Sequence, residues 1–171
     1  MATRKLNVHL GDLVDAMEQP EAYETRWYLD TRTGRLLCVS DELTAALENG
    51  EDAEQLRARL PDWEAPEVEI AGQIVDDAEN RFVNVPSFDT RLCYNLMVEF
   101  IAGLGDEDLR EKLRIAISGK GAFRRFRDVL AHAGAVREQW LAFDRQRKRQ
   151  WATDWLESLD ITTTWQPDDD N

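Results

Sequence analysis

Residues 26–39 read Arg26-Trp27-Tyr28-Leu29-Asp30-Thr31-Arg32-Thr33-Gly34-Arg35-Leu36-Leu37-Cys38-Val39 and carry the clearest strand signal in the chain. Aromatic and aliphatic residues flank a turn in which Asp30 and Gly34 suit the backbone dihedrals of a hairpin. An Asp side chain can bond the backbone two residues on, so we expect Asp30 to close this turn. The stretch therefore predicts a β-hairpin.

Helical patterns lie on both sides of this hairpin. Apolar residues from Leu10 to Met17 recur at helical spacing ahead of it, and Ser40 can cap a helix that follows it and stops near residues 49–50. A further short helix is predicted over residues 53–60. Residues 61–80 fit either a helix or a strand, and the pattern leaves both open. Residues 81–86 alternate and end at a proline, which predicts a third strand.

The second half of the chain reads as helix. Apolar stripes predict helices over residues 92–104, 106–117, 122–131 and 135–159, separated by glycine-containing breaks. Residues 162–171 lack a pattern and end in three Asp residues, so we expect a frayed acidic tail there. The predicted fold is α+β, a small antiparallel sheet of about three strands with a helical C-terminal half, forming a single domain over residues 1–161.

Composition excludes several classes of protein. Of the 171 residues, 43% are hydrophobic and 32% are charged, which is typical of a soluble globular chain. No apolar run approaches the roughly 20 residues of a membrane span, so we expect no membrane association and a cytoplasmic location. Cys38 and Cys93 lack a paired motif and are predicted to be reduced core residues. His9 and His132 lie far apart without a catalytic or zinc motif, so we predict no catalytic residue, metal or cofactor.

The formal net charge of −13 conceals an uneven layout. Residues 1–109 carry 24 acidic and 9 basic side chains, whereas residues 110–149 carry 4 acidic and 12 basic ones. Because salt screens surface charges beyond about 8 Å, a partner responds to the local patch more than to the total. A basic face on an acidic protein is therefore expected, provided that these bases do not meet the chain's own acids.

The order of motifs resembles a known family. Its elements are Tyr28-Leu29-Asp30-Thr31, then Arg81-Phe82-Val83, then Gly119-Lys120-Gly121-Ala122-Phe123-Arg124-Arg125-Phe126, then Trp140 and Trp155-Leu156. From about Leu6 to Ile161 the chain is similar to the bacterial uncharacterised protein family 0158. That family's name records no assigned activity, so the resemblance implies no catalytic residue. The family usually has Arg where this chain has Lys120.

The glycine turn before residue 122 is the first candidate binding site. Free backbone N–H groups at a helix start, with cations alongside, can hold a phosphate. The competing interpretation, which we favour, is a plain turn between two helices with solvated bases and with Phe123 and Phe126 in the core. The predicted anion- or partner-binding residues are Gly119, Lys120, Gly121, Arg124, Arg125 and Arg127.

The second candidate is the densest basic run, formed by Arg145, Arg147, Lys148 and Arg149. We predict a non-enzymatic interaction or regulatory protein that binds an acidic or phosphate-bearing protein partner through these two basic segments. One alternative is nucleic-acid binding by the same surface, which the strongly negative total disfavours. Another is an enzyme acting on a phosphorylated or nucleotide ligand held at Gly119–Ala122, with carboxylates of the N-terminal half as acid and base. The oligomeric state is left open.

Overall fold

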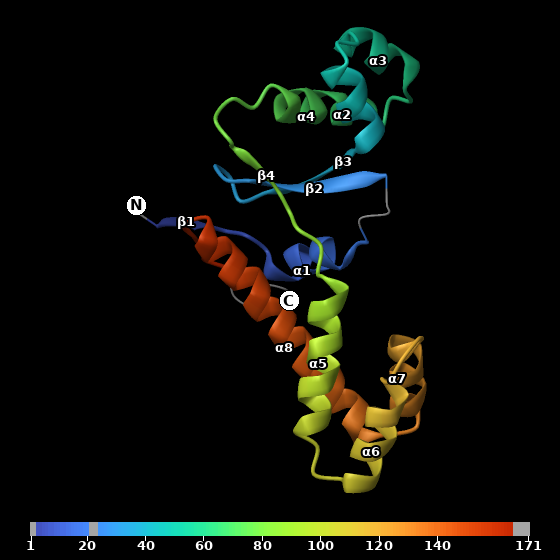
Figure 1. Cartoon of the computed structure of the whole chain (residues 1–171). Helices are drawn as coiled ribbons and strands as arrows, with labels where there is room; N and C mark the ends of the chain where they lie inside the picture. Colours follow the sequence, from blue (N-terminus) through green and yellow to red (C-terminus); the bar gives the residue numbers. More distant parts are fainter. Residues whose placement is uncertain (1–2, 21–23, 166–171) are drawn as a thin grey trace. The chain divides into compact units, whose positions relative to one another are not determined.

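The computed structural model describes residues 3–20 and 24–165 (Figure 1). The chain divides into two compact units, unit 1 with residues 1–87 and 152–171, and unit 2 with residues 88–151. The expectation of a single domain over residues 1–161 stays a prediction.

Unit 1 is built on the predicted three-stranded antiparallel sheet. Strands β2 (Thr25–Asp30), β3 (Leu36–Ser40) and β4 (Phe82–Asn84) pair in the order β3-β2-β4. Trp27 lies opposite Cys38 on one side of β2, and Leu29 lies opposite Val83 on the other. The hairpin and the third strand are therefore confirmed, and the mixed α+β class with them.

The turn between β2 and β3 is held by the side chain predicted to close it. The Asp30 carboxylate accepts hydrogen bonds from the backbone N–H of Arg32 at 2.9 Å and from the Thr33 hydroxyl at 2.7 Å. Gly34 has a φ of +80°, and a Cβ there would lie 3.1 Å from the carbonyl oxygen of Asn7. Both the dihedral and the close backbone approach favour glycine at this position.

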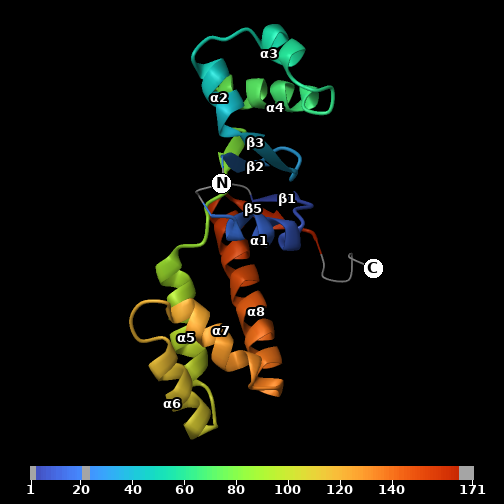
Figure 2. The same cartoon turned by 90° about the vertical axis from the view of Figure 1, so that its right-hand side faces the viewer.

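Of the helices α2 (Asp41–Glu48), α3 (Ala53–Arg59) and α4 (Ala65–Val75), the first and the last lie over one face of this sheet, and α3 packs against α4 (Figure 2). Ser40 and Asp52 cap the first two of these helices, as side-chain acceptors do at helix starts. Within the open segment 61–80 the structure has a helix, α4, and no strand. A proline lies in the first turn of α4, a position that proline favours. Val68 and Ala71 of α4 pack against Val39 of the sheet.

The other side of the sheet carries α1 (Leu10–Glu18) and a pair of short parallel strands, β1 (Arg4–Leu6) and β5 (Ile161–Thr163) (Figure 2). Sequence reasoning missed this pair. The prediction of a frayed tail from residue 162 is wrong for residues 162–165. Thr163 forms hydrogen bonds with the backbone of Val8, and Trp165 is buried. Residues 166–171 of that expected tail lie outside the described residues.

The cysteine prediction is wrong for one of the two residues. Cys38 is exposed on β3, while Cys93 is half-buried, and no disulfide joins them. The strand alternates its side chains between two faces, and the buried residue of this part of β3 is the next one, Val39.

Unit 2 is entirely helical in its regular structure. It contains α5 (Thr90–Ala102), α6 (Glu107–Ala116), α7 (Ala122–Ala131) and residues 135–151 of α8 (Ala135–Ser158). Asp89 and Asp106 cap α5 and α6 through their carboxylates. The core gathers apolar side chains from all four helices, among them Met97, Leu113 and Phe126, with Trp140 packed against it.

The aromatic residues of α7 divide between core and solvent. Phe126 is 1% exposed and meets the ring of Trp140 edge-on, with centroids 4.8 Å apart. Phe123 was expected in the same core but is 37% exposed. It lies in the first turn of the helix, about one turn from Phe126 and two turns from Leu130, and the predicted shared face does not extend to it. The helical C-terminal half itself is confirmed.

Candidate functional site

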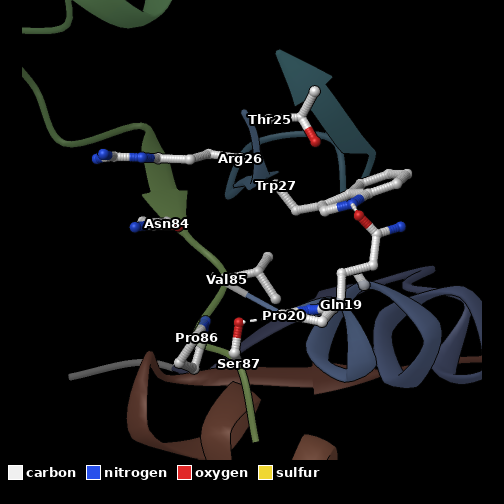
Figure 3. Close-up of a pocket in the computed structure, with 10 residues that line it drawn as sticks. Gln19, Pro20, Thr25, Arg26, Trp27, Asn84, Val85, Pro86 and Ser87 are labelled. Carbon is white, nitrogen blue, oxygen red and sulfur yellow. Dashed lines mark hydrogen bonds between the residues drawn. The ribbon is translucent and has the colours of Figure 1, made fainter. Parts of the chain in front are cut away.

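A pocket of about 350 Å³ in unit 1 lies between the end of α1, strand β2 and the segment that leaves β4 (Figure 3). Its described lining is mostly polar but is internally bonded. The Gln19 side-chain oxygen accepts a 2.9 Å hydrogen bond from the indole of Trp27, and Ser87 donates a 2.8 Å bond to the Gln19 backbone oxygen. These bonds join the end of α1 to β2 and to the segment that leaves β4.

The chemistry of this pocket does not indicate catalysis. Arg26 is the one charged side chain among the described lining residues, and it pairs with Asp41 at 2.9 Å. The lining residues that the structure describes include no carboxylate, histidine or cysteine. Gln19, Trp27 and Ser87 have a structural role, since their hydrogen bonds connect the end of α1 to its neighbours.

The buried carboxylate of unit 1 also has a structural role. Asp30 receives two hydrogen bonds from Arg81, and these bonds hold the pKa of its carboxyl well below the usual range despite its burial. Asp77 accepts from the backbone N–H of Phe82, which lowers the pKa of that carboxyl. Among the described residues, no group of three or more His, Cys, Asp and Glu side chains is arranged to hold a metal ion.

The charge layout follows the two units closely. Unit 2 carries 13 Lys and Arg against 9 Asp and Glu, a formal charge of +4, whereas unit 1 carries 8 against 25, a formal charge of −17. The basic segment seen in the sequence is therefore concentrated in the helical unit. The basic side chains of this segment differ in exposure and in ion pairing, and these differences determine which of them a partner can reach.

The glycine turn forms the exposed connection between α6 and α7. Gly121 is the N-cap of α7 with a φ of +77°, and no side chain caps this helix. Gly119 has a φ of +79°, and Lys120 between them is exposed. The carbonyl oxygen of Ser118 in this turn accepts a hydrogen bond from the Arg125 guanidinium. The turn is thus closed partly by one of the bases predicted to serve a ligand.

The three arginines of α7 are all exposed. Arg124 lies 3.9 Å from Asp128, the predicted pair four residues on, and both side chains are well exposed to solvent. An exposed pair of this kind contributes roughly 0 to 1 kcal/mol, so it leaves the arginine accessible. Arg127 has no ion-pair partner among the described residues. The turn and α7 together, residues 118–131, carry four bases and one acid.

The run at residues 145–149 does not form one exposed basic patch. Arg147 pairs with Glu99 of α5, which raises the pKa of the guanidinium, and Lys148 pairs with Asp144 at 2.8 Å and is 15% exposed. Arg149 is half-buried, and Arg145 is the one base of the four whose residue falls in the exposed class. Arg147 therefore ties α8 to α5, whereas Lys148 is paired within α8.

Sequence reasoning missed a hollow on the outer surface of unit 2. It has a volume of about 390 Å³ and lies between α6 and α7, lined by Lys112, Ile115, Ala116, Arg125, Asp128 and Val129. Ile115 is 61% exposed, although α6 turns Leu113 and Ala116 inward. At about 100° per residue, Ile115 lies some 200° from Leu113, so helical periodicity was the signal that could have found it.

The fold and the surfaces together define a small α+β protein with a basic helical unit and no recognisable catalytic centre in its described residues. The sequence profile of an uncharacterised protein family, UPF0158, matches residues 3–170. The chain belongs to this family, as its motifs had suggested. It is 23% identical over 158 residues to the UPF0158 protein PA5073 of Pseudomonas aeruginosa, covering 92% of this chain and 86% of the relative. No solved structure matches the chain.

Within residues 3–20 and 24–165, none of the helices combines the length and the apolar character that crossing a bilayer requires.

Proposed function

We propose that the protein is a non-enzymatic interaction protein of the cytoplasm, and that α7 with its preceding turn binds an acidic segment of a partner protein. The observation that supports this is the surplus of accessible cations there. Lys120, Arg124, Arg125 and Arg127 are exposed, and Asp128 is the one carboxylate within residues 118–131. Charges arranged in this way steer and orient an acidic partner more than they add raw affinity.

Of the two predicted basic segments, the turn with α7 is the main docking surface. Arg147 and Lys148 are engaged with carboxylates inside unit 2, so they support the helices that present the surface. Arg145 is exposed on α8 and stays a secondary docking residue in the proposal. The glycines at 119 and 121 shape the turn and present Lys120.

A protein partner is favoured over nucleic acid because of the charge of unit 1. A duplex is a long polyanion, and a molecule with a formal charge of −13 repels the parts of it that lie beyond the basic helix. A short acidic segment can bind α7 locally, since screening confines its interactions to within about 8 Å at physiological salt.

The test uses a fluorescein-labelled polyglutamate 20-mer and fluorescence anisotropy at 50 and 150 mM salt. Wild type should bind and should weaken with salt, and Arg124→Glu/Arg127→Glu should lose about tenfold or more in affinity. The matched control is Arg57→Glu/Arg59→Glu, which makes the same change in net charge on α3 of unit 1 and should change affinity less than about threefold.

Three results would overturn the proposal. The first is no polyglutamate binding at 50 mM salt, and the second is an equal loss in the α3 control, which would reflect net charge alone. The third is tighter binding of a labelled 20-nucleotide single strand than of polyglutamate, which would assign the surface to nucleic acid. Circular dichroism of each variant checks that the helices are retained.

A further inference from the structure

The hollow between α6 and α7 adjoins the proposed docking helix and differs from it in chemistry. Its aliphatic lining, called the floor, consists of Ile115 and Ala116 on α6 and Val129 on α7. Its charged lining, called the rim, consists of Lys112 on α6 and of Arg125 and Asp128 on α7. A hollow of about 390 Å³ lies at the small end of the range for ligand sites, roughly 300 to 1,000 Å³.

Packing within unit 2 does not explain Ile115. The core takes Leu113 of α6 and Ile117 just after it, whereas 61% of Ile115 is exposed to solvent. It is more exposed than Val98 or Leu141, the other aliphatic residues of unit 2 with large exposed fractions. An isolated exposed isoleucine is ordinary, but one that forms the floor of a hollow with other aliphatic side chains marks a contact surface.

The charges at the rim select the kind of partner. The Arg125 guanidinium is positioned by its bond to the Ser118 carbonyl oxygen, and it has further N–H donors for a carboxylate. Lys112 supplies a second cation from the facing helix. The rim carboxylate Asp128 already has a cation, Arg124, at 3.9 Å. A segment that carries carboxylates beside one apolar side chain complements all of these groups.

We infer that the α6–α7 hollow is an anchor pocket for one aliphatic or aromatic side chain of an acidic peptide segment, whose carboxylates meet Lys112 and Arg125. The inference rests on the proposed function and adds specificity to it. Charge alone does not distinguish two acidic partners, whereas an apolar side chain buried in the hollow favours the partner that carries it. A second copy of this chain is a poorer occupant for a symmetric contact, because such a contact brings the same basic rims face to face.

The first experiment selects binders from a random 12-residue peptide display library on the immobilised full-length protein. The enriched peptides should be acidic and should share one Leu, Ile, Phe or Trp at a fixed spacing from two carboxylates. A synthetic copy of the best peptide should lose about tenfold in affinity when that apolar residue is replaced by Ser, the loss expected for removing one buried aliphatic group.

The second experiment compares matched truncations of exposed aliphatic residues. Ile115→Ser should weaken the selected peptide about tenfold and leave polyglutamate binding unchanged. Leu141→Ser on α8 is the control, since Leu141 is 38% exposed and is not among the lining residues of the hollow. This variant should bind the selected peptide and polyglutamate with the affinities of wild type. Arg124→Glu/Arg127→Glu should weaken both probes. Sedimentation of the free protein tests the second-copy alternative.

These readouts separate failure of the pocket from failure of the proposed function. Enriched peptides without a shared apolar residue, or peptides insensitive to Ile115→Ser, would overturn the anchor pocket while polyglutamate binding still supports the basic surface. Self-association that Ile115→Ser abolishes would assign the hollow to a second copy and would overturn the peptide inference. Loss of binding to both probes in wild type would overturn both proposals.

Discussion

Arg81 and Asp30, 51 residues apart in the chain, form a two-pronged pair in which Nε donates to Oδ1 at 2.9 Å and Nη2 donates to Oδ2 at 2.7 Å. The Asp30 side chain is 5% exposed. Because the same carboxylate also accepts bonds from Arg32 and Thr33, one buried group ties the β2–β3 turn to the start of β4. The pair fixes the register in which the third strand joins the hairpin.

This arrangement makes stability depend on pH in a defined direction. The pKa of Asp30 is lowered in the folded state, chiefly by the hydrogen bonds from Arg81, relative to an unfolded value of about 3.9. The stabilisation is therefore fully present above about pH 4 and is lost as the pH falls from there toward the folded-state pKa. Asp30→Asn should reduce the free energy of unfolding by about 2 to 3 kcal/mol at pH 7.

Urea unfolding of wild type and Asp30→Asn at several pH values between 2.5 and 7 tests this prediction. The difference between the two proteins should shrink as the pH falls below about 4. Asp41→Asn serves as the control, because Asp41 pairs with Arg26 at a more exposed position and should change stability by less than about 1 kcal/mol. A gap between wild type and Asp30→Asn that stays constant over the whole range would contradict the assignment.

Phe126 is predicted to be the main packing residue of α7. It is almost fully buried and contacts Trp140 edge-on, so Phe126→Ala should cost about 3 to 5 kcal/mol of the free energy of unfolding. Phe123→Ala on the same helix should cost much less, since Phe123 is partly in solvent. Tryptophan fluorescence during urea unfolding measures both. Equal costs for the two substitutions would mean that the core of unit 2 is wrongly described.

Two glycines allow a matched test of backbone conformation. A Cβ at Gly121 would meet no other heavy atom within 4 Å apart from its chain neighbours. Gly121→Ala should therefore lower the free energy of unfolding only by the strain of a left-handed alanine, about 1 kcal/mol. Gly72 in α4 also has open space, and Gly72→Ala should stabilise the protein by about 0.5 to 1 kcal/mol because alanine favours the helix. Thermal melting of both variants checks the opposite signs. A stabilising Gly121→Ala would show that residue 121 is not left-handed.

The two cysteines should differ in reactivity. Cys38 is the more exposed, so iodoacetamide should modify it in the folded protein before Cys93. Partial burial raises the pKa of the Cys38 thiol, so its reaction should be slower at pH 7 than that of a free thiol and should accelerate toward pH 9. Peptide mapping by mass spectrometry identifies the modified residue. Faster modification of Cys93 would contradict the orientation of β3.

Local signals were sufficient for much of the fold. The hairpin at residues 26–39, the Ser40 cap and the helices of the second half were predicted because turn dihedrals, caps and helical periodicity each depend on residues a few positions apart. The basic turn and α7 were predicted as candidates on the same grounds. What they bind stays a proposal.

Contacts between distant residues decided the rest. Strands β1 and β5 have three residues each and stand more than 150 positions apart, so neither shows a periodic pattern and only their pairing makes them strands. The accessible basic surface was likewise decided by packing: Arg147 meets Glu99 on another helix, and Ile115 becomes the floor of a hollow only because α7 lies beside α6. The sequence by itself determined the helices, the hairpin and the local surplus of cations, whereas the tertiary structure determined which cations remain accessible, because an ion pair between helices depends on distance in space and not in sequence.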